Sequence, residues 1–232
     1  MTNSAVPQGR TASPYLVLPL LFGVLLFLAG CVEARTAATE GWSGVTVYNG
    51  YAYIGTEDAR IIQLDAQTGV PRSAPFAAPQ DDEAGFPAFY GTPTISGGLL
   101  FAGGYHGMAY AMRAETLDGV RSFEVAGNPL TKGIAGSVVP VGDSVVIAAA
   151  EDANEGRIYV LEAETMVEEC RYPAQGEDPV GQIWSTPAVV NGVVFVGSMD
   201  HRLHAVRVDD CSPVWDEPAN LHGAVVALAC VG

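Results

Sequence analysis

The sequence predicts an all-β protein, a β-propeller built from repeated small sheets. Short runs rich in Val, Ile and Phe alternate with tight turns, which is typical of antiparallel strands. The same pattern of three runs occurs about four times, and its turn positions 50, 98, 143 and 192 lie 48, 45 and 49 residues apart. A repeat of this length, with three or four strands per unit, is typical of propeller blades.

The copy between Trp184 and Val206 shows the pattern most clearly. Its first run leads into Asn191-Gly192, a dipeptide that favours a two-residue hairpin. A polar turn, residues 198–201, separates the second run from the third. The three runs expected to be strands in this copy are residues 186–190, 193–197 and 202–206.

The three earlier copies follow the same order. Their expected strands are residues 44–50, 51–55 and 60–64, then 92–98, 99–103 and 108–112, then 137–143, 144–148 and 157–161. A weaker fourth strand should follow each third strand, ending near Trp215 in the last copy, because outer strands are half exposed and weakly patterned. In the third copy, an insertion at residues 151–155 precedes the third strand.

A turn with an acidic residue before Thr follows the third strand in three of the copies. Leu64-Asp-Ala-Gln-Thr-Gly69 is echoed at residues 112–116 and 161–165. A carboxylate oxygen followed by Thr-Gly makes a good turn, because the oxygen caps backbone N–H groups and Gly accepts a positive φ. We therefore expect these acids to be turn formers.

The last ten residues begin the pattern again. Residues 223–232 resemble the first strand of a fifth blade, so the sequence predicts about four blades and one further strand in a partial ring. Three arrangements stay open: a truncated product, which we favour, an unusual small ring, or pairing with another chain. An open arc would expose apolar blade faces.

The N-terminal segment is predicted to be a targeting signal. Arg10 precedes an apolar run, residues 15–27, which is short for a transmembrane helix and suits a secretory leader. Leu28-Ala-Gly-Cys31 resembles the bacterial lipobox, and this resemblance implies that Cys31 becomes a lipidated N-terminus at a membrane. The alternative is an ordinary span or signal peptide with a chance Cys. The expected parts are a leader at 1–30, a tether at 31–41 and the repeats at 42–232.

Composition excludes some partners. Hydrophobic residues make up 49% of the chain and charged residues 16%, so most of it should be folded. The net charge of −15 argues against nucleic acid, whose binding needs clustered Lys and Arg. A solvated acidic surface is the simpler explanation for this charge.

Trp184-x-x-Pro-x-Val-x-x-Gly-x-Val-x-Val-Gly197, together with the Asp-Ala-Gln-Thr-Gly turn, resembles the PQQ-like β-propeller repeat. Quinoprotein dehydrogenases and the BamB-like lipoproteins of outer-membrane protein assembly share this repeat. The resemblance covers residues 41–232, nearly all of the mature chain. Trp215 departs from the pattern, because Ser73, Arg121 and Cys170 stand at its place in the other copies.

The resemblance implies two functions. One is a lipid-anchored, non-catalytic scaffold of the bacterial cell envelope that binds protein partners. The other is a fragment of a PQQ-dependent dehydrogenase, whose family members supply Ca ligands, a catalytic Asp, a stacking Trp and often a pair of adjacent Cys. This sequence has no adjacent Cys pair and no matching ligand set. We therefore expect no enzyme activity, no cofactor, no metal site and no catalytic residue.

Individual acids and histidines support this expectation. Asp58 and Asp200 occupy the same repeat position, so both are expected to shape a turn. His201 and His204 are three residues apart and should face opposite sides of a strand. Four residues of the insertion carry oxygen ligands for a hard cation, but a solvated acidic loop is the simpler expectation. These four are Glu151, Asp152, Asn154 and Glu155, while His106 and His222 have no partner at metal spacing.

Three cysteines lie in the repeats. Cys170 should begin an outer strand and Cys211 should lie in a turn of the next blade. A disulfide between them is compatible with an exported protein, but its Cα–Cα distance is not given by sequence. Free buried thiols are the equal alternative, and Cys230 would pair only with a further blade.

Overall fold

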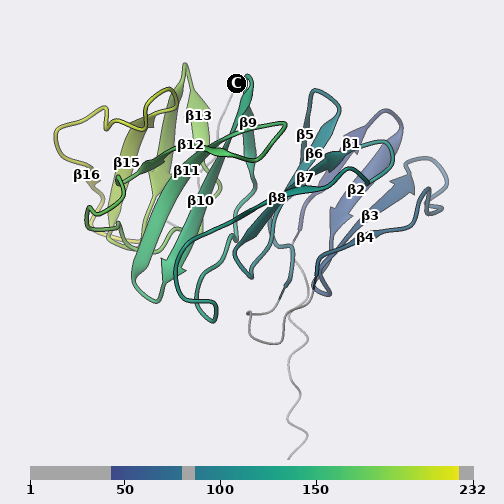
Figure 1. The fold of residues 1–232 in the computed structure, drawn as a ribbon, viewed down its shortest axis with the longest axis horizontal. Coiled ribbons are helices and arrows are strands. Elements are labelled where there is room, and N and C mark those ends of the chain that lie inside the picture. Colours follow the sequence, from purple (N-terminus) through teal and green to yellow (C-terminus); the bar gives the residue numbers. More distant parts are fainter. Residues whose placement is uncertain (1–42, 80–86, 225–232) are drawn as a thin grey trace, which may run out of the picture. The chain divides into compact units, whose positions relative to one another are not determined.

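The computed structural model describes residues 43–79 and 87–224. Every regular element in these residues is a β-strand, and the strands form four antiparallel sheets of four strands each. Figure 1 shows the sheets side by side in chain order. The all-β prediction and the repeat pattern are confirmed. The described part contains no helix with the length and apolar character needed to cross a membrane.

Each sheet is a meander whose strands pair in chain order. The first sheet contains β1 (Val45–Tyr48), β2 (Tyr51–Gly55), β3 (Arg60–Asp65) and β4 (Phe76–Ala77). The second contains β5 (Thr94–Ser96), β6 (Leu99–Gly103), β7 (Met108–Arg113) and β8 (Arg121–Glu124). The third contains β9 (Val139–Val141), β10 (Ser144–Asp152), β11 (Glu155–Glu162) and β12 (Glu168–Tyr172). The fourth contains β13 (Ala188–Val190), β14 (Val193–Gly197), β15 (Arg202–Arg207) and β16 (Ala219–Asn220).

The turn between the first two strands of a sheet follows from its dipeptide. Asn49-Gly50 has φ values of 48° and 79°, and Asn191-Gly192 has 52° and 74°. Two positive φ values in a two-residue loop are the geometry of a type I′ hairpin, for which Asn-Gly is the preferred sequence. The predicted hairpins are therefore confirmed.

The acidic turns after β3 and β11 are also confirmed. Asp65 accepts hydrogen bonds from the backbone N–H of Thr68 at 2.8 Å and of Gln67 at 3.0 Å. Glu162 accepts from the backbone N–H of Thr165 at 2.7 Å. The backbone N–H of Thr68 lowers the pKa of Asp65, and the hydroxyl of Thr165 lowers that of Glu162.

The sheets pack face to face through three apolar clusters, each joining one sheet to the next. One cluster joins the first and second sheets, one the second and third, and one the third and fourth. Members of each cluster are Tyr53 with Met112, Phe101 with Ile147, and Val160 with Val194. A single sheet has no core of its own, so each sheet depends on its neighbours for burial.

Hydrogen bonds also link successive sheets at or just before their first strands. The Thr94 hydroxyl donates to the carbonyl of Val138 at 2.7 Å, and the Thr186 hydroxyl accepts from the N–H of Ser137 at 2.9 Å. Ahead of these strands, Gly91 and Gly136 approach so closely that a Cβ on Gly91 would lie 2.3 Å from the Gly136 carbonyl oxygen. Glycine is required at this crossing.

Three details differ from the predictions. Residues 151–155 are no loop insertion before the third strand, because they lengthen the hairpin and place Glu151 and Asp152 in β10 and Glu155 in β11. The last strand of the fourth sheet follows Trp215 instead of ending there. Cys170 lies in the middle of β12. The expected fifth-blade strand falls mostly outside the described residues, as do the leader, Cys31 and the tether.

Because each meander alternates direction, its connections gather at two ends. One end holds the turn between the second and third strands of each sheet, together with the links from one sheet to the next. We call it the loop end. The other end, with the remaining two turns of each sheet, is the turn end. In Figure 1 the loop end is at the bottom of the view and the turn end at the top.

Candidate functional site

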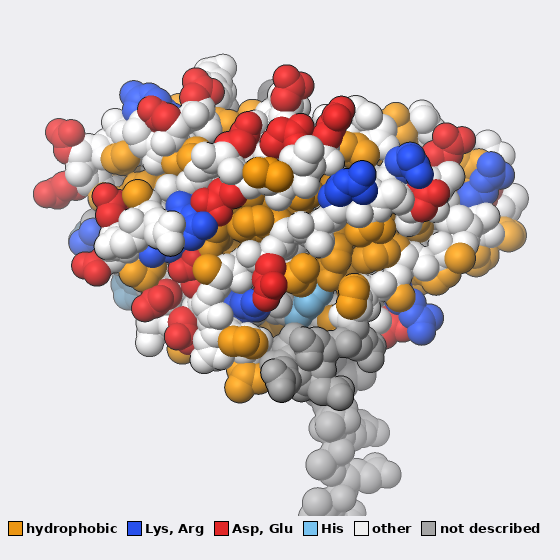
Figure 2. Space-filling model, viewed as in Figure 1, with side chains coloured by type: hydrophobic (Ala, Val, Ile, Leu, Met, Phe, Trp, Pro, Cys, Tyr) orange, Lys and Arg blue, Asp and Glu red, His pale blue; other side chains and the backbone are white. Residues whose placement is uncertain are grey.

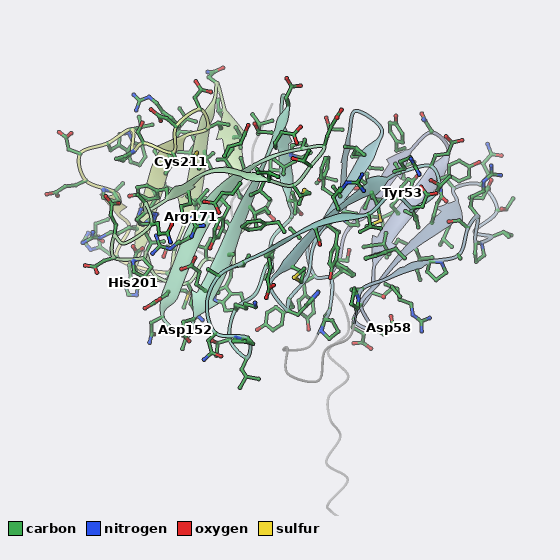
Figure 3. All side chains as sticks on the ribbon, viewed as in Figure 1. Tyr53, Asp58, Asp152, Arg171, His201 and Cys211 are labelled. Carbon is green, nitrogen blue, oxygen red and sulfur yellow. A yellow bond between two sulfur atoms is a disulfide. The ribbon has the colours of Figure 1, made fainter. Side chains whose placement is uncertain are left out.

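The loop end is the candidate functional surface, because it combines long connections with the candidate side chains from the repeats. Figure 3 shows Asp58, Asp152 and His201 toward this end, on three different sheets. Tyr53 and Cys211 lie toward the turn end. The loop end thus carries side chains from distant parts of the sequence, on separate sheets.

Hydrogen bonds fix the connections of the loop end to one another. The Asp152 carboxylate accepts from the Thr131 hydroxyl at 2.8 Å, and its backbone carbonyl accepts from the Gln182 amide at 3.1 Å. The carbonyl of Gln182 in turn accepts from the N–H of Met199 at 3.0 Å. The Thr131 hydroxyl, followed by the N–H of Ala153, lowers the pKa of Asp152. One chain of contacts therefore orders connections of the second, third and fourth sheets.

Three aromatic side chains form a cluster on the loop end. The rings of Tyr105 and Trp184 are stacked, with centroids 5.6 Å apart and an interplanar angle of 25°. Tyr90 meets Tyr105 edge-on at 5.2 Å. All three are half-buried, so the cluster presents aromatic surface to solvent while being held by packing.

Large apolar side chains are also exposed there. Leu130 is 73% exposed, Leu221 47% and Met199 42%. They come from the link between the second and third sheets, the segment after β16 and the β14–β15 turn. Aromatic and apolar groups on an ordered surface are typical of sites that bind proteins.

His106 is buried beneath this surface. Its Nε2 is hydrogen-bonded to the Tyr110 hydroxyl at 2.8 Å, and its Nδ1 has no partner among the described residues. Burial, followed by the nearby Lys132 ammonium, lowers the pKa of His106 to about 4, while Glu124 opposes the shift. Lys132 is itself buried and paired with Glu124 at 2.6 Å. His106 is therefore neutral near pH 7.

Glu151 is buried, which corrects the expected solvated acidic loop at this position, whereas Asn154 and Glu155 are exposed. The Arg157 Nε donates to its carboxylate at 2.8 Å, and the Tyr159 hydroxyl donates to the other oxygen. The remaining Arg157 nitrogens donate to backbone carbonyls that include Glu177, at 3.0 Å. Burial, then the bond to Glu151, raises the pKa of Tyr159. The group is a buried network in which both Glu151 oxygens accept hydrogen bonds.

Asp58 and Asp200 lie in turns, as predicted. Asp58 accepts from the Thr56 hydroxyl at 2.5 Å and pairs with Arg60 at 3.1 Å. Asp200 accepts from the N–H of Arg202 at 3.0 Å and contacts His204 Nε2 at 2.9 Å.

The structure separates the two neighbouring histidines. His204 is buried within β15, whereas His201 is exposed in the turn before that strand, with φ at 69°. The expectation that both lie along one strand is therefore wrong for His201. His222 is exposed after β16.

A Lewis-acid cation beside PQQ would need several converging donor side chains. Within residues 43–79 and 87–224, no three His, Cys, Asp or Glu side chains converge where they would hold a metal ion. Asp58 is paired with Arg60, Glu151 with Arg157 and Asp200 with His204.

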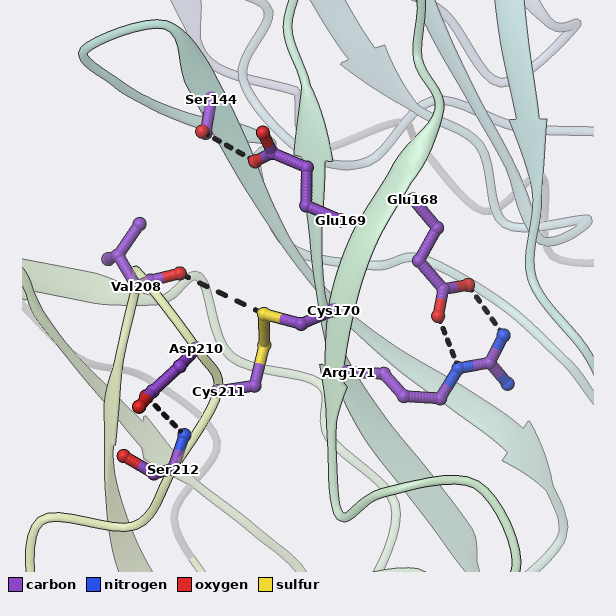
Figure 4. Close-up of a disulfide and its surroundings, with 9 residues drawn as sticks. All are labelled: Ser144, Glu168, Glu169, Cys170, Arg171, Val208, Asp210, Cys211 and Ser212. Carbon is purple, nitrogen blue, oxygen red and sulfur yellow. Dashed lines mark hydrogen bonds and ion pairs between the residues drawn. A yellow bond between two sulfur atoms is a disulfide. The ribbon is translucent and has the colours of Figure 1, made fainter.

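The structure contains a disulfide where the sequence is equally compatible with free thiols. Cys170 and Cys211 are joined, with their Cα atoms 5.8 Å apart, and the bond links β12 of the third sheet to the turn after β15 of the fourth (Figure 4). Beside it, Arg171 pairs with Glu168 at 2.5 Å. This bridge lies toward the turn end and reinforces the packing of two sheets.

The turn end has a different character. Figure 2 shows acidic side chains along the top of the view, where the capped turns lie. A groove of about 350 Å³ between the first two sheets is lined partly by Tyr48, Tyr51 and Glu115. A second groove, of about 150 Å³, occupies the equivalent place between the second and third sheets. Their recurrence identifies these grooves as a product of the repeat.

No protein-family model and no curated protein matches the sequence. Solved structures do match. BamB from Moraxella catarrhalis has a TM-score of 0.58 and 21% identity, covering 75% of this chain and 52% of that one. A europium-containing methanol dehydrogenase has a TM-score of 0.65 and 15% identity, covering 78% of this chain and 42% of that one.

A further match is the quinohemoprotein alcohol dehydrogenase from Comamonas testosteroni, with a TM-score of 0.62, 16% identity, and coverage of 76% and 35%. These neighbours are β-propellers of PQQ-like repeats, so the resemblance seen in the sequence is confirmed. At such identities the likeness establishes the fold alone. The chain spans about half or less of the length of each neighbour.

Sequence reasoning missed the residues that give the loop end its character. Tyr90, Tyr105 and Leu130 carry no repeat signature, and the sequence indicates for Trp184 only a place in the repeat motif. The aromatic cluster arises from three separate connections, so no local pattern predicts it. The sequence does contain one indication of this surface, which is the presence of large apolar residues in the segments that connect the strands.

Proposed function

We propose that this protein is a non-catalytic scaffold of the bacterial cell envelope, lipid-anchored through Cys31, that binds protein partners with its loop end. One observation carries the proposal: hydrogen bonds hold the connections of the loop end, where Leu130, Met199 and Leu221 are exposed and Tyr105 stacks on Trp184. An ordered apolar surface favours binding because little entropy is lost when a partner docks.

The likeness to BamB supports a role in envelope protein assembly, and the lipobox supports attachment to a membrane. The alternative is a quinoprotein dehydrogenase, which the likeness to two alcohol-oxidising enzymes supports. The described donor groups favour the scaffold, because they are bonded within turns and ion pairs.

Site-specific photo-crosslinking in the bacterium that makes the protein tests the binding surface. A photoreactive amino acid at Leu130 or Leu221 should give defined cross-links to envelope proteins. The same amino acid at Val167, which is 62% exposed in the turn before β12, should not. Equal cross-linking from all three positions, or none from the loop end, would contradict the proposal.

Two further measurements address the alternatives. Titration of the full chain with PQQ and Ca²⁺ should show no saturable binding and no dye-linked dehydrogenase activity, and a positive result would favour the enzyme. Labelled palmitate should enter the protein in cells, and the Cys31→Ala variant should abolish the label. Label retained in this variant would remove the anchor.

A further inference from the structure

The first sheet has one apolar face that packs against no other described sheet. Its β1, β2 and β3 positions align as Val45–Ile54–Ile62 and Val47–Ala52–Leu64, so these six side chains share a side. Val45 is 55% exposed and Val47 65%, while the other four are half-buried. We call these six residues the leading face.

The equivalent side chains in the second and third strands of the other sheets are buried. In the second sheet they include Leu100 and Met112, which pack against the first sheet. In the third they include Val145 and Ile147, which pack against the second. Each inner sheet thus uses this face to contact the sheet before it. The leading face is therefore an inter-sheet contact surface whose partner is absent from the described residues.

The fourth sheet carries the complementary surface. Its β13, β14 and β15 align as Ala188–Phe195–Ala205 and Val190–Val193, with Leu203 on the same side. Val190 is 46% exposed, and most of the rest are half-buried. In the second sheet the matching positions include Phe101 and Ala111, which pack against the third sheet. We call these six residues of the fourth sheet the trailing face.

We propose that a second copy of this chain covers both faces, with the trailing face of each copy packed against the leading face of the other. The three apolar clusters already join a trailing-type face to a leading-type face inside one chain. Figure 1 shows the first and fourth sheets at opposite ends of the described stack. A second copy supplies both complementary faces by its nature, whereas any other partner must supply two different surfaces.

A closed pair leaves neither face open. Two head-to-tail contacts related by a two-fold axis close a ring, whereas contacts without closure produce filaments.

The net charge of each copy makes pairing depend on the ionic strength of the solution. None of the twelve side chains in the two faces is ionisable. The charged residues on the same sides, Arg60 and Arg207, stand at strand ends and are exposed. Each chain nevertheless carries a net charge of −15, which repels a second copy at long range. Salt screens this repulsion, so pairing strengthens as ionic strength rises.

The test measures the mass of the full chain, purified in a mild detergent, by light scattering and sedimentation. The native chain should run at twice the mass of one copy. Val47→Asp on the leading face and Val190→Asp on the trailing face should each weaken pairing at least about tenfold, because the introduced charge would be buried in an apolar contact. Val167→Asp is the matched control, at an exposed position outside both faces, and should leave pairing unchanged.

Mixing the two face variants separates this geometry from others. Val47→Asp keeps an intact trailing face and Val190→Asp an intact leading face, so the mixture should form one-to-one pairs through one native contact. A native chain that stays single at every concentration and salt, or that forms filaments, overturns the proposal. The proposal is also overturned if Val190→Asp still forms pairs with itself, or if the mixture of the two variants contains only single copies. Val47 and Val190 are exposed in one copy, so circular dichroism should show both variants folded.

Discussion

The first and third sheets are built from the same repeat but differ in what surrounds them. The central strands of the third sheet, β10 and β11, have nine and eight residues, nearly all buried. In the first sheet, β2 and β3 have five and six residues, and one face is open. Ile54 and Ile147 are the fourth residues of β2 and β10, yet Ile147 is fully buried and Ile54 only half-buried. The repeat therefore determines the strand, and the neighbouring sheet determines its burial.

The same contrast holds for charged pairs. In the third sheet, Glu151 and Arg157 are about one-tenth exposed or less. At the matching hairpin of the first sheet, Asp58 and Arg60 are both about half exposed. A buried pair depends on its partner, whereas water replaces the partner of an exposed pair at little cost.

The buried pair should give the largest effect. Arg157→Met leaves the Glu151 carboxylate buried without its cation and should lower the free energy of unfolding by about 3–5 kcal/mol. The matched change Arg60→Met should cost less than about 1 kcal/mol. Urea unfolding of both variants measures the difference, and equal costs would refute the contrast between the sheets.

Shortening the two isoleucines tests the apolar side of the comparison. Ile147→Ala opens a cavity between the second and third sheets and should cost about 2–5 kcal/mol. Ile54→Ala, measured in dilute protein, should cost about 1 kcal/mol or less, because water already reaches that face. A cost for Ile54→Ala as large as that for Ile147→Ala would show that the first sheet is covered within one chain.

The disulfide joins the third sheet to the fourth, and no disulfide among the described residues joins the third sheet to the second. Replacing both Cys170 and Cys211 by Ala should lower stability by about 2–4 kcal/mol, because the bond closes a loop with a sequence separation of 41 residues. Thermal unfolding with and without reductant measures this loss. The native chain should be sensitive to reductant and the double variant insensitive. A native chain indifferent to reductant would contradict a structural role for the bond.

His106 gives the second sheet a pH dependence. The pKa of His106 is lowered to about 4 in the folded chain, against about 6.5 when unfolded, so the unfolded chain binds more protons between these values. Stability should therefore fall as pH drops from about 6.5 toward 4, by about 2 kcal/mol at pH 5. His106→Gln should remove this slope, while His222→Gln, an exposed control, should keep it. An unchanged slope in His106→Gln would exclude His106 as its source.

Much of the fold follows from local sequence. Asn49-Gly50 and Asn191-Gly192 determine their hairpins because few other residues accept two positive φ values. The spacing of these turns and the apolar runs between them define the repeat, and Asp65 shapes its turn through its own carboxylate. These features need only neighbouring residues.

Features that depend on packing between sheets were not predictable. Residues 151–155 have the composition of a loop, and they extend a hairpin because Arg157 and Tyr159 satisfy the buried Glu151. The Tyr105–Trp184 stack likewise joins segments 79 positions apart in the sequence. Partner choice at the loop end depends on such non-local arrangements, which repeat patterns do not encode.

The central claim is that the leading face is open in one chain and covered in a pair. The most direct test is the unfolding free energy of Ile54→Ala, relative to the native chain, measured across a range of protein concentrations. The cost of the substitution should grow with concentration as pairing buries Ile54, while that of Ile147→Ala stays constant. A cost of Ile54→Ala that is the same at every concentration would contradict the claim.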